Sequence, residues 1–214
     1  MKMAEAPVNR GFCIGLAIGQ IWLSLISTSF VAILWVVGQN PAQVILILVG
    51  VILVGLLLLG ASLILLRKAL RLPGAASTED AARSRAIGKK MGLWFGLVVL
   101  AEVVIIGAMN AVLSLTNHGE WITPVTFFLV GLHFAPLAYL FHVRPYIVLG
   151  ILWVLINLLT VLLTPASMLL GQGLSAWVVF PIVGCGLATW AVVASILGSS
   201  LQRVQHVLRL PLSA

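Results

Sequence analysis

Six long apolar runs, separated by short polar or charged segments, dominate the hydrophobic pattern of the chain. About 20 apolar residues are enough for a helix to cross the roughly 30 Å hydrocarbon core of a bilayer. The pattern therefore predicts an all-α fold, an integral membrane six-helix bundle that forms a single transmembrane domain over residues 1–214. The predicted spans are residues 11–37, 44–66, 91–115, 122–140, 146–163 and 175–197.

Composition excludes a water-soluble fold. Hydrophobic residues make up 62% of the chain and charged residues only 8%, whereas a soluble domain carries about 25% charged residues. The longest segment between spans, residues 67–90, is too short for a domain with its own core. The net charge of +7 would suggest nucleic acid for a soluble protein, but here the placement of a few charges matters more. We expect the lipid bilayer, and no nucleic acid, as the partner.

The basic residues predict the orientation. All 12 Lys and Arg residues lie in the N-terminal segment, in residues 67–90, in the turn at 141–145 and in the C-terminal tail. The positive-inside rule then places both termini and the basic loop at 67–90 in the cytoplasm of a multi-pass cell-membrane protein. The first run is too long for the apolar region of a signal peptide, about 7 to 15 residues, so we expect an uncleaved helix.

Three cytoplasmic features allow further hypotheses. The loop at 67–90 either binds anionic lipid or only determines the topology. Inside it, residues 77–80 resemble a helix start. Residues 201–210 of the tail are compatible with a short interfacial helix that ends at Pro211.

Small and polar residues indicate which helix faces point inward. Gly11, Gly15 and Gly19 recur every four residues, which favours close packing within the chain or a homodimer. A second stripe on this span comprises Ala17, Gln20, Ser24 and Ser27, and one on span five comprises Gly150, Trp153, Asn157, Thr160 and Thr164. Both stripes should face protein or water. Glycine is the main interruption of span two, at positions 50, 55 and 60, so we expect that span at the periphery.

Two prolines lie inside predicted spans. Pro136 would free the carbonyl of Leu132, and Pro181 would free that of Trp177. Each proline is consistent with a kink or a gate, and equally with ordinary packing, because proline is common in membrane helices.

A set of polar side chains is predicted near the middle of the membrane. Glu102 is the one acidic residue inside a span, about 16 Å from the cytoplasmic edge at 1.5 Å per residue, and His133 reaches a similar depth on the next span. Gln20 and Asn157 reach comparable depths. The five spans other than span two should surround this set, and the second ring nitrogen of His133 is expected to meet Thr126.

A carboxylate in hydrocarbon is costly unless it is paired, hydrated or protonated. Glu102 is therefore a candidate ion or proton site, with structural hydrogen bonding as one alternative and a solvated cavity without transport as another. No arrangement typical of an intramembrane hydrolase is present. Cys13 and Cys185 fall in different spans, and no Cys/His spacing resembles a metal site, so we expect no disulfide, metal or cofactor.

The sequence GLHFAPLAYL at residues 131–140 resembles a pattern, G-x-H-x-x-P-x-x-x-L, of an uncharacterised family of small bacterial membrane proteins. The resemblance covers about twenty residues around span four. It implies a bacterial inner-membrane protein of about six helices and draws attention to His133 and Pro136, but it supplies no activity.

The leading functional hypothesis is binding or transport of a small solute, with a proton linkage through Glu102 and His133. The alternative is a non-transporting membrane scaffold, accessory subunit or lipid-interacting protein, in which the polar residues only hold helices together.

Overall fold

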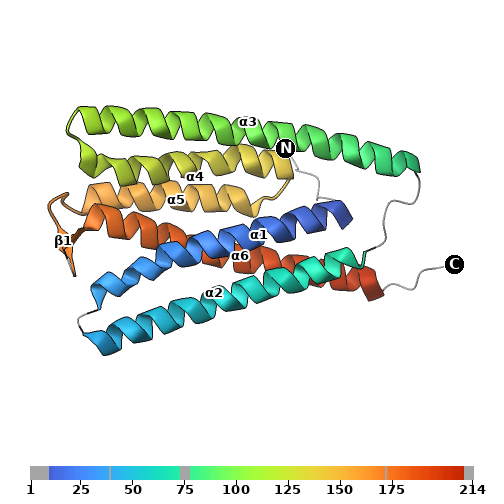
Figure 1. Ribbon diagram of the computed structural model, residues 1–214, viewed down its shortest axis with the longest axis horizontal. Helices are drawn as coiled ribbons and strands as arrows, with labels where there is room; N and C mark the ends of the chain where they lie inside the picture. Colours follow the sequence, from blue (N-terminus) through green and yellow to red (C-terminus); the bar gives the residue numbers. More distant parts are fainter. Residues whose placement is uncertain (1–9, 39, 73–77, 172, 210–214) are drawn as a thin grey trace.

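The computed structural model describes residues 10–38, 40–72, 78–171 and 173–209. These residues form six long helices, side by side and roughly antiparallel to their neighbours in sequence (Figure 1). All six are long and apolar enough to cross a membrane, so the all-α six-helix membrane bundle is confirmed. The elements in chain order are α1 (Arg10–Ala32), the 3₁₀ helix η1 (Ile33–Val37), α2 (Pro41–Leu70), α3 (Thr78–Leu115), the 3₁₀ helix η2 (Gly119–Trp121), α4 (Ile122–Phe141), α5 (Pro145–Leu163), β1 (Leu169–Leu170), β2 (Leu174–Ser175) and α6 (Ala176–Arg209).

Local chemistry explains several helix ends. Asn40 caps α2 by accepting a hydrogen bond from the backbone nitrogen of Gln43 at 3.0 Å, and Pro41 follows at the first helical position, where its missing N–H costs nothing. Pro145 opens α5 in the same way. Between α5 and α6 the chain forms a small antiparallel ladder of β1 with β2.

The helices extend beyond the predicted spans at the basic end. Residues 67–90 are not a loop throughout, because α2 continues to Leu70 and α3 begins at Thr78. The tail is not a separate interfacial helix either, since α6 runs without a break to Arg209. Lys, Arg and Glu are good helix formers, and nothing in these segments ends a helix at the membrane boundary. The predicted helix start is confirmed at Thr78; Ser77 and Pro211 lie outside the described residues.

The helices pack in an order different from the one expected. The interior is built by α1 against α2 and α6, and by α5 against α4 and α6, whereas α3 packs almost entirely on α4. None of the most apolar part of α3 is buried, compared with 11% for α2. The most peripheral helix is therefore α3. As expected, most of α2 is exposed too, but α2 packs on α1 and α6 and so belongs to the bundle more closely than predicted. A purely apolar helix surface packs equally well on protein and on lipid, so composition does not distinguish the two.

Both predicted polar stripes are buried apart from Thr164, which is half-buried and follows the last residue of α5. On α1 the buried residues include Ala17, Gln20, Ser24 and Ser27. On α5 they include Gly150, Trp153, Asn157 and Thr160. Around Trp153 the aromatic rings of Phe30, Phe127 and Phe134 pack at centroid distances of 6.3, 5.3 and 5.4 Å. This cluster forms the core where α1, α4 and α5 meet.

The glycine positions correct the packing prediction for α1. Gly11 is exposed, a Cβ at Gly15 would have nothing within 4 Å, and one at Gly19 would meet only the Tyr146 hydroxyl at 3.8 Å. A Cβ at Gly55 of α2, in contrast, would lie 2.6 Å from Oγ1 of Thr28. The close contact between α1 and α2 is thus made at Gly55. On α1, Gly11 and Gly15 are exposed, whereas Gly19 is half-buried and faces Tyr146 of α5.

The second close approach joins α4 to α5. A Cβ at Gly150 would lie 2.6 Å from the carbonyl oxygen of Gly131. Gly131 is the first residue of the pattern at 131–140, so in this chain that glycine lets two helix backbones approach each other.

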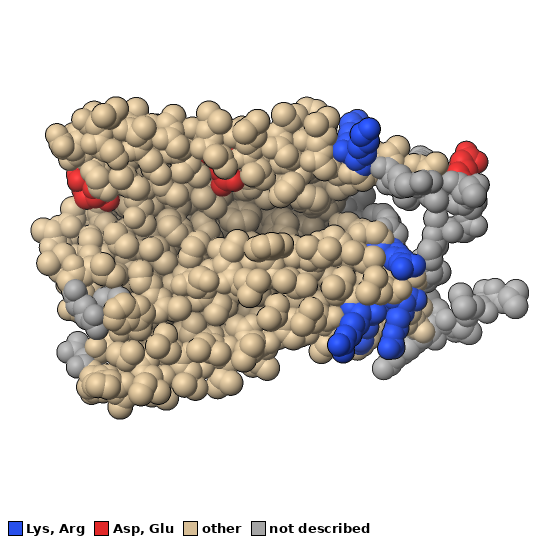
Figure 2. Space-filling model, viewed as in Figure 1, with Lys and Arg blue, Asp and Glu red and all other residues tan. Residues whose placement is uncertain are grey.

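Charged side chains are separated along the bundle. The Lys and Arg side chains visible in Figure 2 gather at one end, where α2 and α6 end and α3 begins. The opposite end carries Glu120, which lies 3.4 Å from His118. The basic residues, which lie in only some of the segments between the apolar runs, therefore come together at one end of the bundle.

Candidate proton site between α3 and α4

The structure brings Glu102 and His133 together in the middle of their helices. Oε2 of Glu102 and Nδ1 of His133 lie 2.9 Å apart, and 17% and 10% of the two side chains are exposed. The distance is that of an ion pair, but Nδ1 makes no aligned hydrogen bond. The two groups are thus close enough for an ion pair, which forms when the imidazole is protonated. Consecutive antiparallel helices explain the encounter, as the sequence predicted.

Two further contacts continue the seam between these helices. Toward the basic end, the rings of Phe95 and Phe141 meet edge to face at 5.8 Å. Toward the opposite end, the Thr126 hydroxyl donates to Oδ1 of Asn110 at 3.2 Å. The three contacts keep one antiparallel register, and they hold an otherwise exposed α3 against the bundle.

The partner of Thr126 differs from the expected one. It bonds Asn110 rather than the second ring nitrogen of His133, because seven residues of helix separate the two positions by about 10 Å. The sequence did carry a signal for Asn110, which lies two i, i+4 steps after Glu102 and so near the same face.

The surface is hollowed beside this seam. Figure 2 shows a recess between α3 and the helices on the α1 side, which opens toward the basic end. Acidic atoms lie at its inner margin, midway along the bundle. The Glu102 side chain is itself partly exposed.

Gln20 belongs to a different contact. Its Nε2 donates to the hydroxyl of Tyr146 at 3.2 Å and so joins α1 to α5. Its Oε1 is buried without a hydrogen-bond partner among the described residues. Gln20 therefore serves the interior of the bundle, whereas Glu102 lies at the margin.

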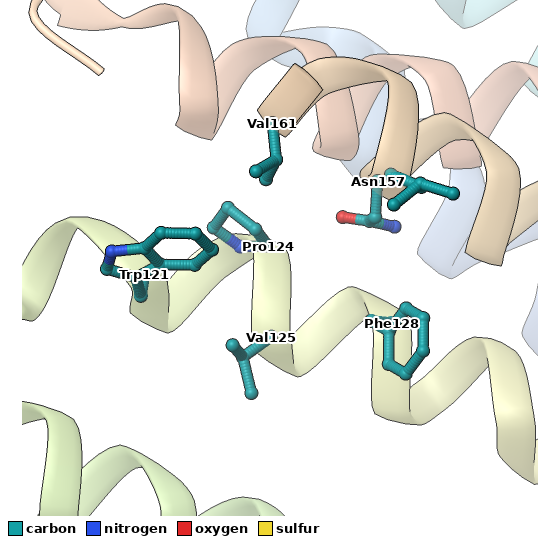
Figure 3. A pocket seen from close by; sticks show the side chains of 7 residues that line it. Trp121, Pro124, Val125, Phe128, Asn157 and Val161 are labelled. Carbon is teal, nitrogen blue, oxygen red and sulfur yellow. The ribbon is translucent and has the colours of Figure 1, made fainter. Parts of the chain in front are cut away.

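Asn157 also lies apart from the pair. Its Nδ2 donates to the carbonyl of Trp153 at 2.7 Å and to the sulfur of Cys185 at 3.6 Å. Asn157 lines a cavity of about 150 Å³ between α4 and α5 (Figure 3), and neither Glu102 nor His133 lines it. The four polar residues predicted near the midplane thus occupy three separate environments.

The prolines lie in unbroken helices. Pro136 is exposed inside α4, and Pro181 is fully buried inside α6. Just beyond Pro181, a Cβ at Gly184 would lie 2.8 Å from Ile156, and one at Gly186 would lie 2.7 Å from Val31. Tight packing on two neighbouring helices holds this part of α6 in place, so the geometry favours a packing role there over a gate.

In the described ranges, no group of three or more His, Cys, Asp or Glu side chains is arranged to bind a metal ion. Cys13 and Cys185 are both free and buried. Comparison of the chain with protein-family models, with characterised proteins and with solved structures finds no match.

Proposed function

We propose that this membrane protein binds or transports a small solute in a process linked to the protonation of Glu102 and His133. The observation that carries the proposal is the 2.9 Å contact of a carboxylate with an imidazole, both partly exposed, in the middle of two apolar helices. An ionisable side chain at that depth is costly, and it commonly marks a pathway for ions or protons.

The pair has the chemistry to exchange a proton. A carboxylate accepts a proton readily, and an imidazole changes its charge near neutral pH. Because the two groups are in contact, a change of charge on one alters the energy of the other. A solute with a positive charge or a donor group would compete with the imidazole for Oε2, and its binding would then release or take up a proton.

A second function is favoured by the other polar residues. Gln20 bonds Tyr146, and Asn157 bonds Trp153 and Cys185, so two of the four predicted site residues hold their own chain together. If Glu102 and His133 only fasten α3 to α4 in the same way, the protein is a scaffold, an accessory subunit or a lipid-interacting protein.

The proposal also includes the location of the protein in the cell and its assembly. The basic end of the bundle supports a cytoplasmic position for both termini and contact of residues 67–90 with anionic lipid. The pattern at 131–140 supports a bacterial inner membrane. A homodimer through Gly11, Gly15 and Gly19 is supported by the open space beside Gly15.

The test is a proton-flux measurement. Purified protein is reconstituted into liposomes that contain trapped pyranine, and organic cations, amino acids and sugars are added in turn. We expect one class to cause a pH change that depends on the protein and disappears in Glu102→Gln, which keeps the side-chain volume but cannot ionise. The matched control is Glu120→Gln, which alters the exposed pair with His118 and should leave the flux unchanged.

Three results would contradict the transport proposal. These are normal flux in Glu102→Gln, equal loss of flux in the control, and no flux with any solute for the unmodified protein. The last result would favour the scaffold.

A further inference from the structure

The Glu102 side chain is accessible from the membrane side of the bundle. α3 packs almost entirely on α4, and none of its most apolar part is buried. The uncovered 17% of this side chain therefore faces the bilayer or the recess beside α3 (Figure 2) rather than a space enclosed by protein. A ligand can thus approach the carboxylate from the membrane.

The carboxylate oxygens are the open atoms of the pair. In the described chain, neither oxygen of Glu102 has an aligned hydrogen bond. The buried polar atoms without such a bond nevertheless include Nδ1 of His133 and neither of these oxygens, so the oxygens reach the surface while Nδ1 is covered. A bound molecule would meet the carboxylate before Nδ1 of the imidazole.

The surroundings of the carboxylate are apolar. The residues three and four positions away on α3 share its helix face; they are Val98, Val99, Ile105 and Ile106. The same spacing from His133 on α4 gives only leucine, valine and proline. A ligand group that needs further hydrogen bonds would lack partners there, which is costly in a membrane. The site therefore favours an apolar molecule with one polar head.

The charge of the site favours a cation. Of the titratable groups on α4 and η2, against which α3 packs, His133 is the one in contact with Glu102. Tyr139 lies six residues farther along α4, about 9 Å, and Lys90 lies twelve residues back along α3, about 18 Å, while Glu120 belongs to η2. With a neutral imidazole, the carboxylate is the one charge at this depth among these described groups, and it attracts cations and repels anions.

The basic end of the bundle makes the bilayer the favourable route. The recess opens toward the end where Lys and Arg side chains gather (Figure 2), and these repel a cation that arrives from water. A cation with an apolar body concentrates in the membrane instead and reaches α3 without passing them.

We infer that Glu102 binds a monovalent organic cation with an apolar body, which enters from the bilayer beside α3 and exchanges for one proton. This inference rests on the proposed function and names its class of solute. Because an unpaired carboxylate in hydrocarbon is costly, the empty pair holds one proton, on the carboxylate or on the imidazole. The cation takes the place of this proton, which leaves to water, so the charge of the site is conserved.

The experiment compares 4-fluorobenzyltrimethylammonium with its neutral isostere, 1-fluoro-4-neopentylbenzene, in which carbon replaces the charged nitrogen. Binding is measured by ¹⁹F NMR with the protein in nanodiscs of zwitterionic lipid and empty nanodiscs as reference, and proton release with a pH indicator. We expect saturable binding of the cation with release of about one proton, and no saturable binding of the isostere. Tetramethylammonium, which has the charge without the apolar body, should bind at least about tenfold more weakly.

Two pairs of variants locate the site. Glu102→Gln should abolish binding and proton release, whereas Glu120→Gln, in the exposed pair near the bundle end, should change neither. Ile105→Lys places an ammonium group one turn from Glu102 and should block the cation, whereas Val104→Lys, at the same depth on another face, should not. Both positions are exposed, at 50% and 60%, so the cost of the lysine to folding is similar.

Saturable binding of the isostere with equal affinity, or cation binding that survives in Glu102→Gln, would overturn the inference. If Glu102→Gln does not fold, the lysine pair decides: loss of binding confined to Ile105→Lys supports the site, and equal effects of both variants overturn it.

These results are distinguishable from failure of the proposed function. No binding of the cation, together with a Glu102-dependent proton flux driven by an amino acid or a sugar, would overturn the inference alone. No binding and no flux with any solute would overturn both. Proton release on cation binding without flux in liposomes would support the inference and restrict the proposed function to binding.

Discussion

Adding one methyl group at Gly55 should destabilise the bundle, although this glycine lies on a helix that is otherwise almost uniformly apolar. The new Cβ would lie 2.6 Å from Oγ1 and 2.7 Å from Cγ2 of Thr28, well inside the 3.5–4.0 Å of a normal carbon contact. Thr28 cannot easily rotate away. It is β-branched, and its Oγ1 donates to the carbonyl of Ser24 at 2.6 Å and accepts from Nε1 of Trp190 at 3.4 Å.

The expected change in the free energy of unfolding combines two opposing effects. Overpacking of this kind costs about 1–3 kcal/mol, while replacing glycine by alanine inside a helix gains about 1 kcal/mol. Gly50→Ala on the same helix has the gain without the clash, because nothing lies within 4 Å of its Cβ. The free energy of unfolding of Gly55→Ala should therefore fall below that of Gly50→Ala by about 1–3 kcal/mol.

The assay is unfolding by SDS in mixed micelles, followed by circular dichroism, with both variants measured in the background of wild-type Thr28 and of Thr28→Ala. The second background removes Oγ1 and Cγ2 and leaves only the Cβ of residue 28, 3.2 Å from the new methyl group, so most of the difference between Gly55→Ala and Gly50→Ala should disappear there. Equal stability of the two alanine variants in the wild-type background would refute the close contact. A difference that persists undiminished in Thr28→Ala would show that another neighbour causes it.

Three further predictions concern other contacts. Gly150→Ala should cost about 3 kcal/mol or more in the same assay, because its Cβ meets a backbone carbonyl that cannot move aside; a cost below that of Gly55→Ala would contradict this. Glu102→Leu leaves His133 without its partner and should lower the unfolding free energy by about 1–3 kcal/mol, whereas an unchanged value would mean that the pair contributes nothing to packing. In a cysteine-free background, a cysteine at Asn117 should react with an impermeant maleimide in intact cells and one at Ala82 should not, and the reverse pattern would invert the orientation.

Much of the architecture follows from the sequence alone. Apolar runs of membrane-spanning length determine the six helices, since a helix satisfies its own backbone hydrogen bonds in lipid. Polar residues at helical spacing also predict a buried face, because Ser24, Ser27 and Asn157 avoid hydrocarbon wherever protein is available. The meeting of Glu102 with His133 was predictable as well, since a short connection forces antiparallel neighbours.

Only the tertiary structure decides which apolar faces meet protein and which meet lipid. Lipid tails are as apolar as leucine, so no hydrophobic driving force separates α2, which packs on α1 and α6, from α3, which packs on α4. The same reason explains the glycines: whether a Cβ is tolerated at Gly15 or Gly55 depends on a neighbour distant in sequence, Thr28 for the latter. The spacing of residues along one helix reveals which faces that helix has. How all six helices pack together decides which surface each face meets, and therefore also why Glu102 and Asn157 lie apart.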